Sequence, residues 1–360
     1  MKNLTKLTAL LMCFVMVLAL AACGSSSGSS ATAATTAAAG ETAAAETEAS
    51  ASDFKFAVVI GVGGLGDGSF NDSLKEGADM ACEAFGIDGY QLIEPTEVAE
   101  FEGHFTDLSA SGEYDLIVAG GFDAIEAMSK VAAEFPDQKY LFVDGEVAGL
   151  DNVKSVTYRD NEKAYCLGIM AAMETESDTL GIVMALDIDS LRVFTSGFMA
   201  GALSVNPDMK FSIKVVGGFA DTTTAKELAI AEQQEGIDII YTVAGGSGLG
   251  CFAAAEETTG LRCIGVDVNQ CLISPSVVMA SGLRLMQNTV CNGIGAAMDG
   301  SFVGGAASEG IPEDALSFTV EGSECAPSDE AVAAAWAAFD AIKAGEITVP
   351  STYAEVGYEG

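Results

Sequence analysis

Two phenylalanines stand in glycine-rich, polar surroundings, where an aromatic side chain has little apolar company. Phe70 follows the glycine-rich run 61–68, and Phe219 follows Gly217 and Gly218. Aromatic rings on opposed surfaces can sandwich a flat solute, and each stacked base contributes roughly 1–3 kcal/mol in nucleic-acid proteins. A core position is the competing interpretation for either ring alone. Together the two rings predict a cleft that grips a planar molecule.

Carboxylates end several of the strand-like runs of this chain. Asp123 and Asp267 each stand at such an end, and a carboxylate can accept hydrogen bonds from two neighbouring hydroxyls of a sugar ring. Asp144 and Asp67 are weaker candidates, because helix or turn capping explains each of them at least as well. Arg284 is the one cation among these positions. It either donates to a solute or balances the local acids.

The glycines after the first apolar run also match a nucleotide-binding pattern. Gly61, Gly63 and Gly66 fit G-x-G-x-x-G, in which a helix opens around the second glycine and cradles a pyrophosphate. Here the residues around Gly66 would interrupt that helix, so we expect it to start near Asn71, capped by Asn71 or Ser69. The pattern therefore predicts a turn, and we expect no dinucleotide or other cofactor.

These residues are positioned by alternating strands and helices. Near-continuous apolar strands between helical patterns predict an α/β fold with parallel sheets covered on both faces, whose carboxyl edges bind ligands. The predicted strands are 56–60, 90–93, 116–119, 140–143, 180–184, 211–216, 237–243 and 263–266. The predicted helices include 71–85, 124–135, 162–173, 196–205, 223–234, 250–258 and 329–343.

The folded part is long enough for two such sheets. Polar segment 154–161 is expected to cross to a second lobe, 277–286 to cross back, and 317–320 to cross a third time. Residues 53–157 and about 284–316 then form lobe 1, and about 158–283 and 317–360 form lobe 2.

The first residues are typical of an export signal. Lys2 and Lys6 precede the apolar run 7–20, and Leu20-Ala21-Ala22-Cys23 resembles the lipobox of bacterial lipoproteins. The run is shorter than the roughly 20 residues of a membrane span. We predict a signal peptide over 1–22, lipidation of Cys23 and a flexible Gly/Ser/Ala/Thr/Glu linker over 23–52, with the protein anchored on the outer face of the cell membrane.

Charge and cysteines exclude several classes of protein. A formal charge of −36 argues against nucleic-acid binding and against anionic lipid surfaces. The seven cysteines beyond Cys23 lack metal-ligand spacing and are expected to be small apolar side chains, although one disulfide is compatible with export. The single histidine, His104, lies in a segment expected at the surface. No nucleophile–base pair and no metal site is evident.

The run Gly63–Asn71 resembles the signature GG-x-x-D-x-SFN of the basic membrane protein family. The likeness continues in order through Gly197–Ala202, Gly218–Asp221, Gly245–Gly248 and Gly265–Gln270. These proteins are substrate-binding lipoproteins of ABC transporters, and their PnrA-like members bind purine nucleosides. The resemblance implies a two-lobed, type I periplasmic-binding-protein-like fold, a nucleoside ligand, a membrane permease as partner and a monomeric chain.

The resemblance also implies ligand contacts for the matching positions, which are Asn71, Asp123, Gly246 and Asp267. The chain departs from the family pattern twice. An acid that often touches the base is replaced by Gly61, and a lysine near the hinge is replaced by Arg284, whose donor geometry is different.

Charge selects among the ligands. The acids outnumber the cations at the predicted site, so a nucleotide phosphate would be repelled and a neutral nucleoside fits better. The alternatives are a sugar or another small solute, a surface sensor of the same fold, and, more remotely, a nucleoside hydrolase that uses the strand-end acids. A DNA-binding regulator is disfavoured by the signal peptide and the acidic composition.

Overall fold

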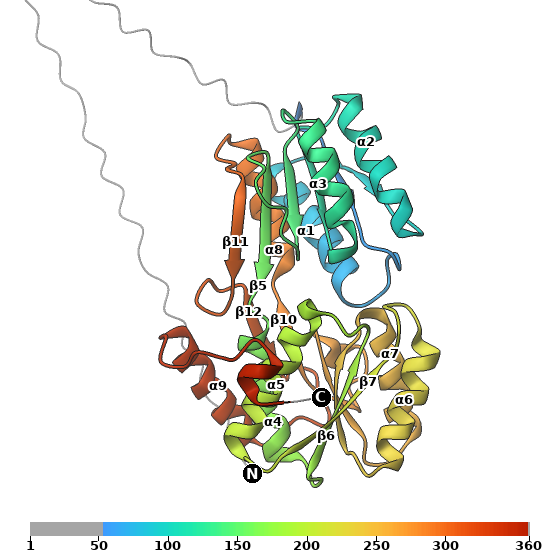
Figure 1. Cartoon of the computed structure of the whole chain (residues 1–360), viewed down its shortest axis with the longest axis vertical. Helices are drawn as coiled ribbons and strands as arrows, with labels where there is room; N and C mark the ends of the chain where they lie inside the picture. Colours follow the sequence, from blue (N-terminus) through green and yellow to red (C-terminus); the bar gives the residue numbers. More distant parts are fainter. Residues whose placement is uncertain (1–52, 359–360) are drawn as a thin grey trace, which may run out of the picture. The chain divides into compact units, whose positions relative to one another are not determined.

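The computed structural model describes residues 53–358, so the predicted signal peptide, Cys23 and the linker lie outside the described residues. Within that range the chain forms two six-stranded sheets with helices on both faces (Figure 1). This confirms the predicted α/β class. We call the sheet that contains the first strand, with its helices, lobe 1, and the other sheet with its helices lobe 2.

Lobe 1 holds a wholly parallel sheet. Its strand order is β11-β5-β4-β3-β1-β2. The helices α1 and α8 pack together, as do α2 and α3. Its strands are β1 (Phe56–Val59), β2 (Gln91–Ile93), β3 (Leu116–Gly120), β4 (Tyr140–Val143), β5 (Val153–Tyr158) and β11 (Gly305–Glu309). Its helices are α1 (Phe70–Phe85), η2 (Val98–Glu100), α2 (Phe101–Ser111), η3 (Phe122–Ala124), α3 (Ile125–Glu134) and α8 (Met286–Met298).

Lobe 2 has the same plan, with one antiparallel edge strand. Its order is β12-β10-β9-β8-β6-β7, and only β12 runs antiparallel to its neighbour. Its strands are β6 (Thr179–Met184), β7 (Lys210–Val215), β8 (Ile239–Val243), β9 (Arg262–Gly265), β10 (Val278–Arg284) and β12 (Leu316–Thr319). Its helices are α4 (Asn161–Glu174), α5 (Asp189–Val205), α6 (Thr222–Gln234), η4 (Gly245–Ser247), α7 (Gly248–Glu257), η5 (Gln270–Leu272), α9 (Asp329–Lys343) and α10 (Tyr353–Val356).

The strands read as continuous apolar runs because both faces of each sheet are covered. Every residue of β1 and β8 is buried. One apolar core extends from the α1/α8 face of lobe 1 to the α4/α5/α9 face of lobe 2. Separate cores fill the α2/α3 face of lobe 1 and the α6/α7 face of lobe 2. The site-bearing loops therefore rest on a rigid support.

The chain passes between the sheets three times. It crosses at Arg159–Asp160 between β5 and α4, at Leu285 between β10 and α8, and at 310–315 between β11 and β12. The three segments expected to cross are mostly strands that lead into or out of these short connections. All eight predicted strands are present to within two residues. Strands β5, β10, β11 and β12 were not predicted as strands, and helices α2 and α10 were not predicted.

The cysteines are free within residues 53–358, and five of the seven are buried. Burial raises the pKa of Cys251 and Cys271 to about 12, so these thiols stay protonated. This agrees with the expected apolar packing role. The described residues also include no helix that is both long and apolar enough to cross a membrane.

Candidate ligand-binding site

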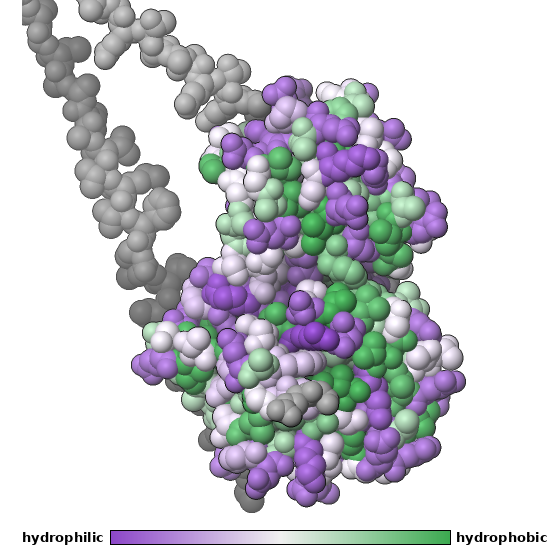
Figure 2. Space-filling view, viewed as in Figure 1, coloured by the Kyte–Doolittle hydropathy of each residue, from purple (hydrophilic) through white to green (hydrophobic). Residues whose placement is uncertain are grey.

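A cavity of about 250 Å³ lies between the loops that follow the strands of the two lobes. The surface is hollowed where the lobes meet (Figure 2). The structure brings all nine residues predicted for ligand binding to this one cavity. They are Asp67, Phe70, Asn71, Asp123, Asp144, Phe219, Gly246, Asp267 and Arg284. Ligand contact by each of them remains a prediction.

Phe70 forms one side of the cavity. It is the first residue of α1, and its half-buried ring lies against three glycines. A Cβ on Gly120 would come within 3.1 Å of the ring, and Cβ atoms on Gly61 and Gly121 within 3.8 and 3.7 Å. The glycines of lobe 1 therefore let the backbone approach this aromatic face closely.

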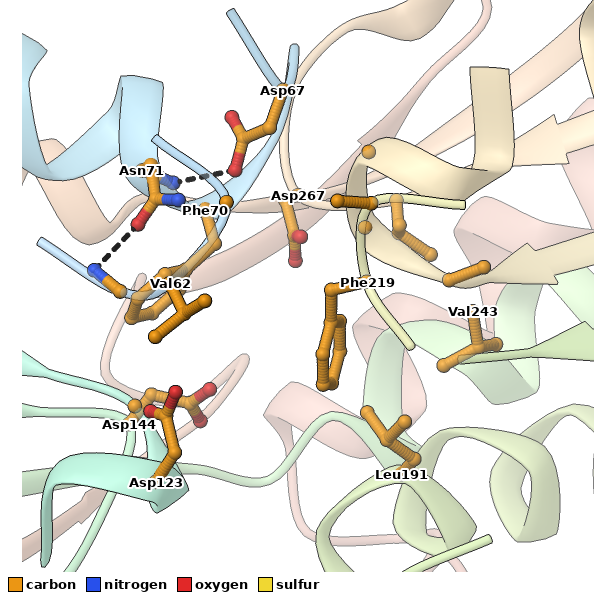
Figure 3. Close-up of a pocket in the computed structure, with 18 of the residues that line it drawn as sticks. Val62, Asp67, Phe70, Asn71, Asp123, Asp144, Leu191, Phe219, Val243 and Asp267 are labelled. Carbon is orange, nitrogen blue, oxygen red and sulfur yellow. Dashed lines mark hydrogen bonds between the residues drawn. The ribbon is translucent and has the colours of Figure 1, made fainter. Parts of the chain in front are cut away.

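Phe219 lies on the opposite side, in the loop between β7 and α6 (Figure 3). Ser247 holds this loop, because its backbone N–H donates to the Phe219 carbonyl at 2.8 Å and its hydroxyl donates to the Gly218 carbonyl at 2.8 Å. Gly245 has φ 54°, and its missing Cβ leaves room for the ring. Two aromatic faces from different lobes thus flank the cavity.

Phe122 is an aromatic residue of the site that the sequence analysis missed. It is 39% exposed, and its ring centroid lies 5.8 Å from that of Phe219, across the boundary between the lobes. It stands between Gly121 and Asp123, in the same glycine-rich setting as Phe70 and Phe219. That setting was the available signal.

The loop before α1 is organised by two residues that also line the cavity. The Asp67 carboxylate accepts hydrogen bonds from the backbone N–H groups of Ser69 and Asn71, both at 2.9 Å. It therefore caps the helix, whereas Ser69, among the described residues, makes no side-chain capping bond. Burial raises the pKa of Asp67, although these N–H donors act to lower it. Ser69 occupies the N-cap position, as predicted, but the side chain that accepts the free N–H groups is that of Asp67, for which a capping role had been considered.

Asn71 is committed to the same loop. Its Oδ1 accepts from the Gly61 N–H at 2.8 Å, and its Nδ2 donates to the Gly64 carbonyl at 3.0 Å. A Cβ on Gly61 would lie 3.1 Å from that Oδ1. Gly61, which stands where the family often has an acid, thus lies where the Asn71 side chain comes too close for a larger side chain to fit easily.

Asp123 and Asp144 follow adjacent strands of lobe 1, β3 and β4. Burial raises the pKa of Asp123, while the backbone N–H groups of Asp123, Ala124 and Val62 act in the opposite direction. Burial likewise raises the pKa of Asp144, although Arg284 opposes the shift. Asp144 has φ 61°, an uncommon backbone conformation for an aspartate. It pairs with Arg284 at 2.9 Å instead of capping a turn.

Arg284 lies at the end of β10 and belongs to a buried charge network. It forms hydrogen bonds with Asp160 at the first crossing and with Asp144, and its Nε lies 3.7 Å from Asp267. Lys163 also binds Asp160 and is fully buried. Burial alone would raise the pKa of Asp160, but the two cations lower it. Two roles were considered for Arg284, donation to a solute and balance of the local acids, and in the structure it bonds the local acids.

The rest of the lining is mostly apolar, and the sequence analysis missed it. Gly246 of lobe 2 lies close to Asp67 of lobe 1, since a Cβ there would come within 3.4 Å of the Asp67 Cβ. Helix α5 contributes a polar residue and two apolar ones. The missed residues include Val62, Leu65, Ser190, Leu191, Phe194, Thr222, Leu249 and Val266. The types and local pattern of these residues are those of ordinary helices, strands and loops. The sequence therefore does not show that they line a cavity, because the cavity forms only where the two lobes meet.

Residues 53–358 contain no group of three or more His, Cys, Asp or Glu side chains that could hold a metal ion. His104 lies on α2 and is not among the residues that line the cavity. The site offers aromatic faces and hydrogen-bond acceptors.

Two α/β lobes with a cavity between their strand ends define the chain as a two-lobed solute-binding protein. A crystal structure of an ABC transporter solute-binding protein from Aeropyrum pernix matches it with a TM-score of 0.77 and 29% identity, covering 84% of this chain and 95% of that one. This confirms the expected periplasmic-binding-protein-like fold. The chain belongs to the family of PnrA-like ABC transporter substrate-binding proteins, whose model matches residues 54–352. It is a family of binding proteins and not of enzymes.

Individual relatives are distant. The chain is 31% identical over 229 residues to an ABC transporter nucleoside-binding protein, BmpA, of Lactococcus lactis. The matched region covers 61% of this chain and 65% of BmpA, so the chain spans just under two thirds of the length of that relative. It is 29% identical over 277 residues to an uncharacterized lipoprotein of Pyrococcus abyssi, covering 73% of this chain and 68% of that one.

Proposed function

We propose that this protein captures a nucleoside, with a purine base as the first candidate, for an ABC importer. One observation carries the proposal. Phe70 and Phe219 flank a single cavity from different lobes, and the carboxylates of Asp123, Asp144 and Asp267 line the same cavity. A flat base fits between two aromatic faces, and ribose hydroxyls are donors that suit carboxylates. The name of the Lactococcus relative supports the same class of ligand.

Size and charge favour a neutral nucleoside over a nucleotide. A volume of about 250 Å³ is close to the low end of small-molecule sites, roughly 300–1,000 Å³. Arg284, which would have to meet a phosphate, already bonds two carboxylates. A phosphate would enter beside several aspartates and would be repelled.

Location and partners are part of the proposal. The lipobox-like residues before Cys23 and a relative named as a lipoprotein support a lipid anchor on the outer face of the cell membrane. The family supports a membrane permease as partner. We propose that a monomeric chain closes its lobes around the solute, and that the permease recognises the closed form.

A thermal-shift screen over nucleosides, free bases and simple sugars tests the proposal. A ligand at 100 times its Kd adds about 2.7 kcal/mol of stability, so a true ligand gives a clear shift. We expect purine nucleosides to give the largest shifts, and calorimetry to find adenosine tighter than AMP. Stabilisation by sugars alone would point to the sugar-binding alternative. Release of free base from inosine would point to a hydrolase.

A further inference from the structure

Two buried side chains bridge the lobes directly beside the cavity. Ser69 directly precedes α1 in lobe 1, and its hydroxyl donates a hydrogen bond to Asp267 Oδ2 in lobe 2. Gln270 of lobe 2 donates from Nε2 to the Gly68 carbonyl of lobe 1 at 3.0 Å. Ser69 is 0% and Gln270 1% exposed. We call Gly68, Ser69, Asp267 and Gln270 the interlobe clasp. The binding proposal gives a role to Asp267 but none to Gly68, Ser69 and Gln270.

Each half of the clasp is held by its own lobe. Gln270 Oε1 accepts the Val266 N–H at 2.9 Å, so the side chain is anchored at the end of β9 while its amide reaches the other lobe. Gly68 has φ 56°, and a Cβ there would lie 2.9 Å from Ile273 Cδ1 of lobe 2. The positive φ favours glycine at this position. The clasp is therefore a preorganised contact.

Asp267 connects the clasp to the cavity. The residue is 7% exposed, and it lines the cavity. Oδ2 is bound to Ser69, whereas Oδ1 has no hydrogen-bond partner within the described residues, and the Arg284 Nε stays at 3.7 Å. A buried acceptor without a donor is unfavourable. A solute hydroxyl or amino group would satisfy Oδ1 while Ser69 satisfies Oδ2.

We propose that Ser69 is a positioning residue that couples solute binding to lobe closure through Asp267, with Gln270 as a second tie. Neither Ser69 nor Gln270 is among the residues that line the cavity, so both act without touching the solute. The inference rests on the proposed function in that it requires a solute with a hydrogen-bond donor. Because these bonds exist only when the lobes meet, they slow the opening of the cleft more than they affect the first encounter.

The test compares two clasp variants with two controls. Ser69→Ala removes the donor to Asp267. Gln270→Glu keeps the acceptor for Val266 and removes the donor to Gly68. Ser69→Thr retains the hydroxyl and serves as the rescue variant. Ser129→Ala removes a serine hydroxyl that bonds within α3, away from the cavity.

Stopped-flow binding uses the panel solute that stabilises the wild type most. We expect Ser69→Ala, which removes a hydrogen bond to a carboxylate, to raise koff about tenfold or more. Gln270→Glu, which removes a hydrogen bond to a backbone carbonyl, should raise koff about twofold to tenfold. In both variants kon should change less than about twofold. Ser69→Thr and Ser129→Ala should match the wild type. An unchanged koff in Ser69→Ala, or an equal change in kon and koff, overturns the proposal.

Lobe closure is measured separately, so that the two proposals fail independently. Single-molecule energy transfer between non-natural amino acids at Asp107 on α2 and Glu227 on α6, both exposed, reports the interlobe distance. We expect a smaller closed fraction in Ser69→Ala than in the wild type, with or without solute. If no panel solute binds the wild type, the nucleoside proposal fails. An unchanged distance distribution in the ligand-free variant would then overturn the clasp on its own.

Discussion

Arg284 and Asp160 form a two-pronged ion pair, with Nε–Oδ1 at 2.7 Å and Nη2–Oδ2 at 2.5 Å. Asp160 lies at the first crossing between the lobes, and Arg284 lies directly before the second. The guanidinium also lies 4.7 Å from the Phe194 ring centroid and 5.3 Å from that of Tyr158. The planar fork of arginine suits this paired and stacked setting better than a lysine ammonium would. The first two crossings between the lobes, at Arg159–Asp160 and at Leu285, are therefore linked by an ion pair as well as by the backbone.

Replacing Arg284 by methionine should destabilise the fold strongly. Removal of one partner leaves Asp160 buried with only Lys163 as its cation, and breaking a buried pair costs about 3–5 kcal/mol. Urea unfolding would measure the loss. Arg284→Lys keeps the charge without the fork, and we expect an intermediate loss. Lys75→Met, which breaks the exposed pair with Asp79, is the matched control and should cost at most about 1 kcal/mol. Equal losses would mean that the hinge pair contributes nothing special.

Replacing Phe219 by alanine should weaken binding without unfolding the protein. The ring is half-buried, lies in a loop and faces the cavity. We expect the Kd measured by calorimetry with the best nucleoside to rise about tenfold to hundredfold, following the roughly 1–3 kcal/mol of a stacked base. Phe302→Ala removes a half-buried ring of lobe 1 outside the cavity and should leave the Kd unchanged. Phe70 also packs on the core, so Phe70→Ala should lower both affinity and melting temperature. A normal Kd in Phe219→Ala would remove the stacking model.

Affinity should fall as the solution is acidified. Burial raises the pKa of Asp123 and of Asp144, so each takes up its proton at a higher pH than an ordinary aspartate of pKa 3.8. A protonated carboxyl accepts donors less well, and the ionised form binds ribose better. Calorimetry from pH 7.5 down towards pH 4 should show the Kd rising as the pH falls, with the rise beginning above the pH at which an ordinary aspartate is protonated. Asp123→Asn should bind more weakly at pH 7.5 and with a flatter profile, whereas exposed Asp107→Asn should follow the wild type. An identical slope in Asp123→Asn would exclude this carboxylate.

The sequence predicted the strands with continuous apolar runs and missed those without one. Strand β11, Gly-Ala-Ala-Ser-Glu, lies at a sheet edge with half-buried and exposed residues, so no apolar run marks it. Helix α2 did carry a signal, because Phe101, Phe105 and Leu108 follow the helical period and are buried. Intervening charged and polar residues masked it.

Most of the predicted site residues follow strand ends or the glycine-rich loop before α1, and what the sequence did not predict is how they pair. Arg284 and Asp160 are 124 positions apart, and Ser69 and Asp267 are 198 apart. No local pattern links either pair. Phe122 was within reach of the argument used for Phe70 and Phe219, since it also follows a glycine pair. Local chemistry identified the members of the site, but their partners depend on how the two lobes meet.

Glu232 should make the stability of lobe 2 depend on pH. This α6 side chain is fully buried, its Oε1 accepts from Ser212 at 2.8 Å, and its Oε2 has no partner in the range 53–358. Burial raises its pKa from 4.5 to about 7, against the effect of Ser212. Between these values the folded chain holds a proton that the unfolded chain has released, so stability falls as pH rises, by up to about 1.4 kcal/mol per pH unit. The loss is complete above about pH 7 and absent below about pH 4.5.

Urea unfolding from pH 5 to 8 measures this slope. Glu232→Gln keeps the shape and cannot ionise, so its stability should decline less with pH, and at pH 8 it should exceed the wild type by an amount on the order of 3 kcal/mol. Glu227→Gln, on the exposed face of the same helix, removes a carboxylate without changing a buried one and should keep the wild-type slope. The buried carboxyl would lose this role if Glu232→Gln and the wild type showed parallel stability curves, because the proton uptake would then belong to other groups.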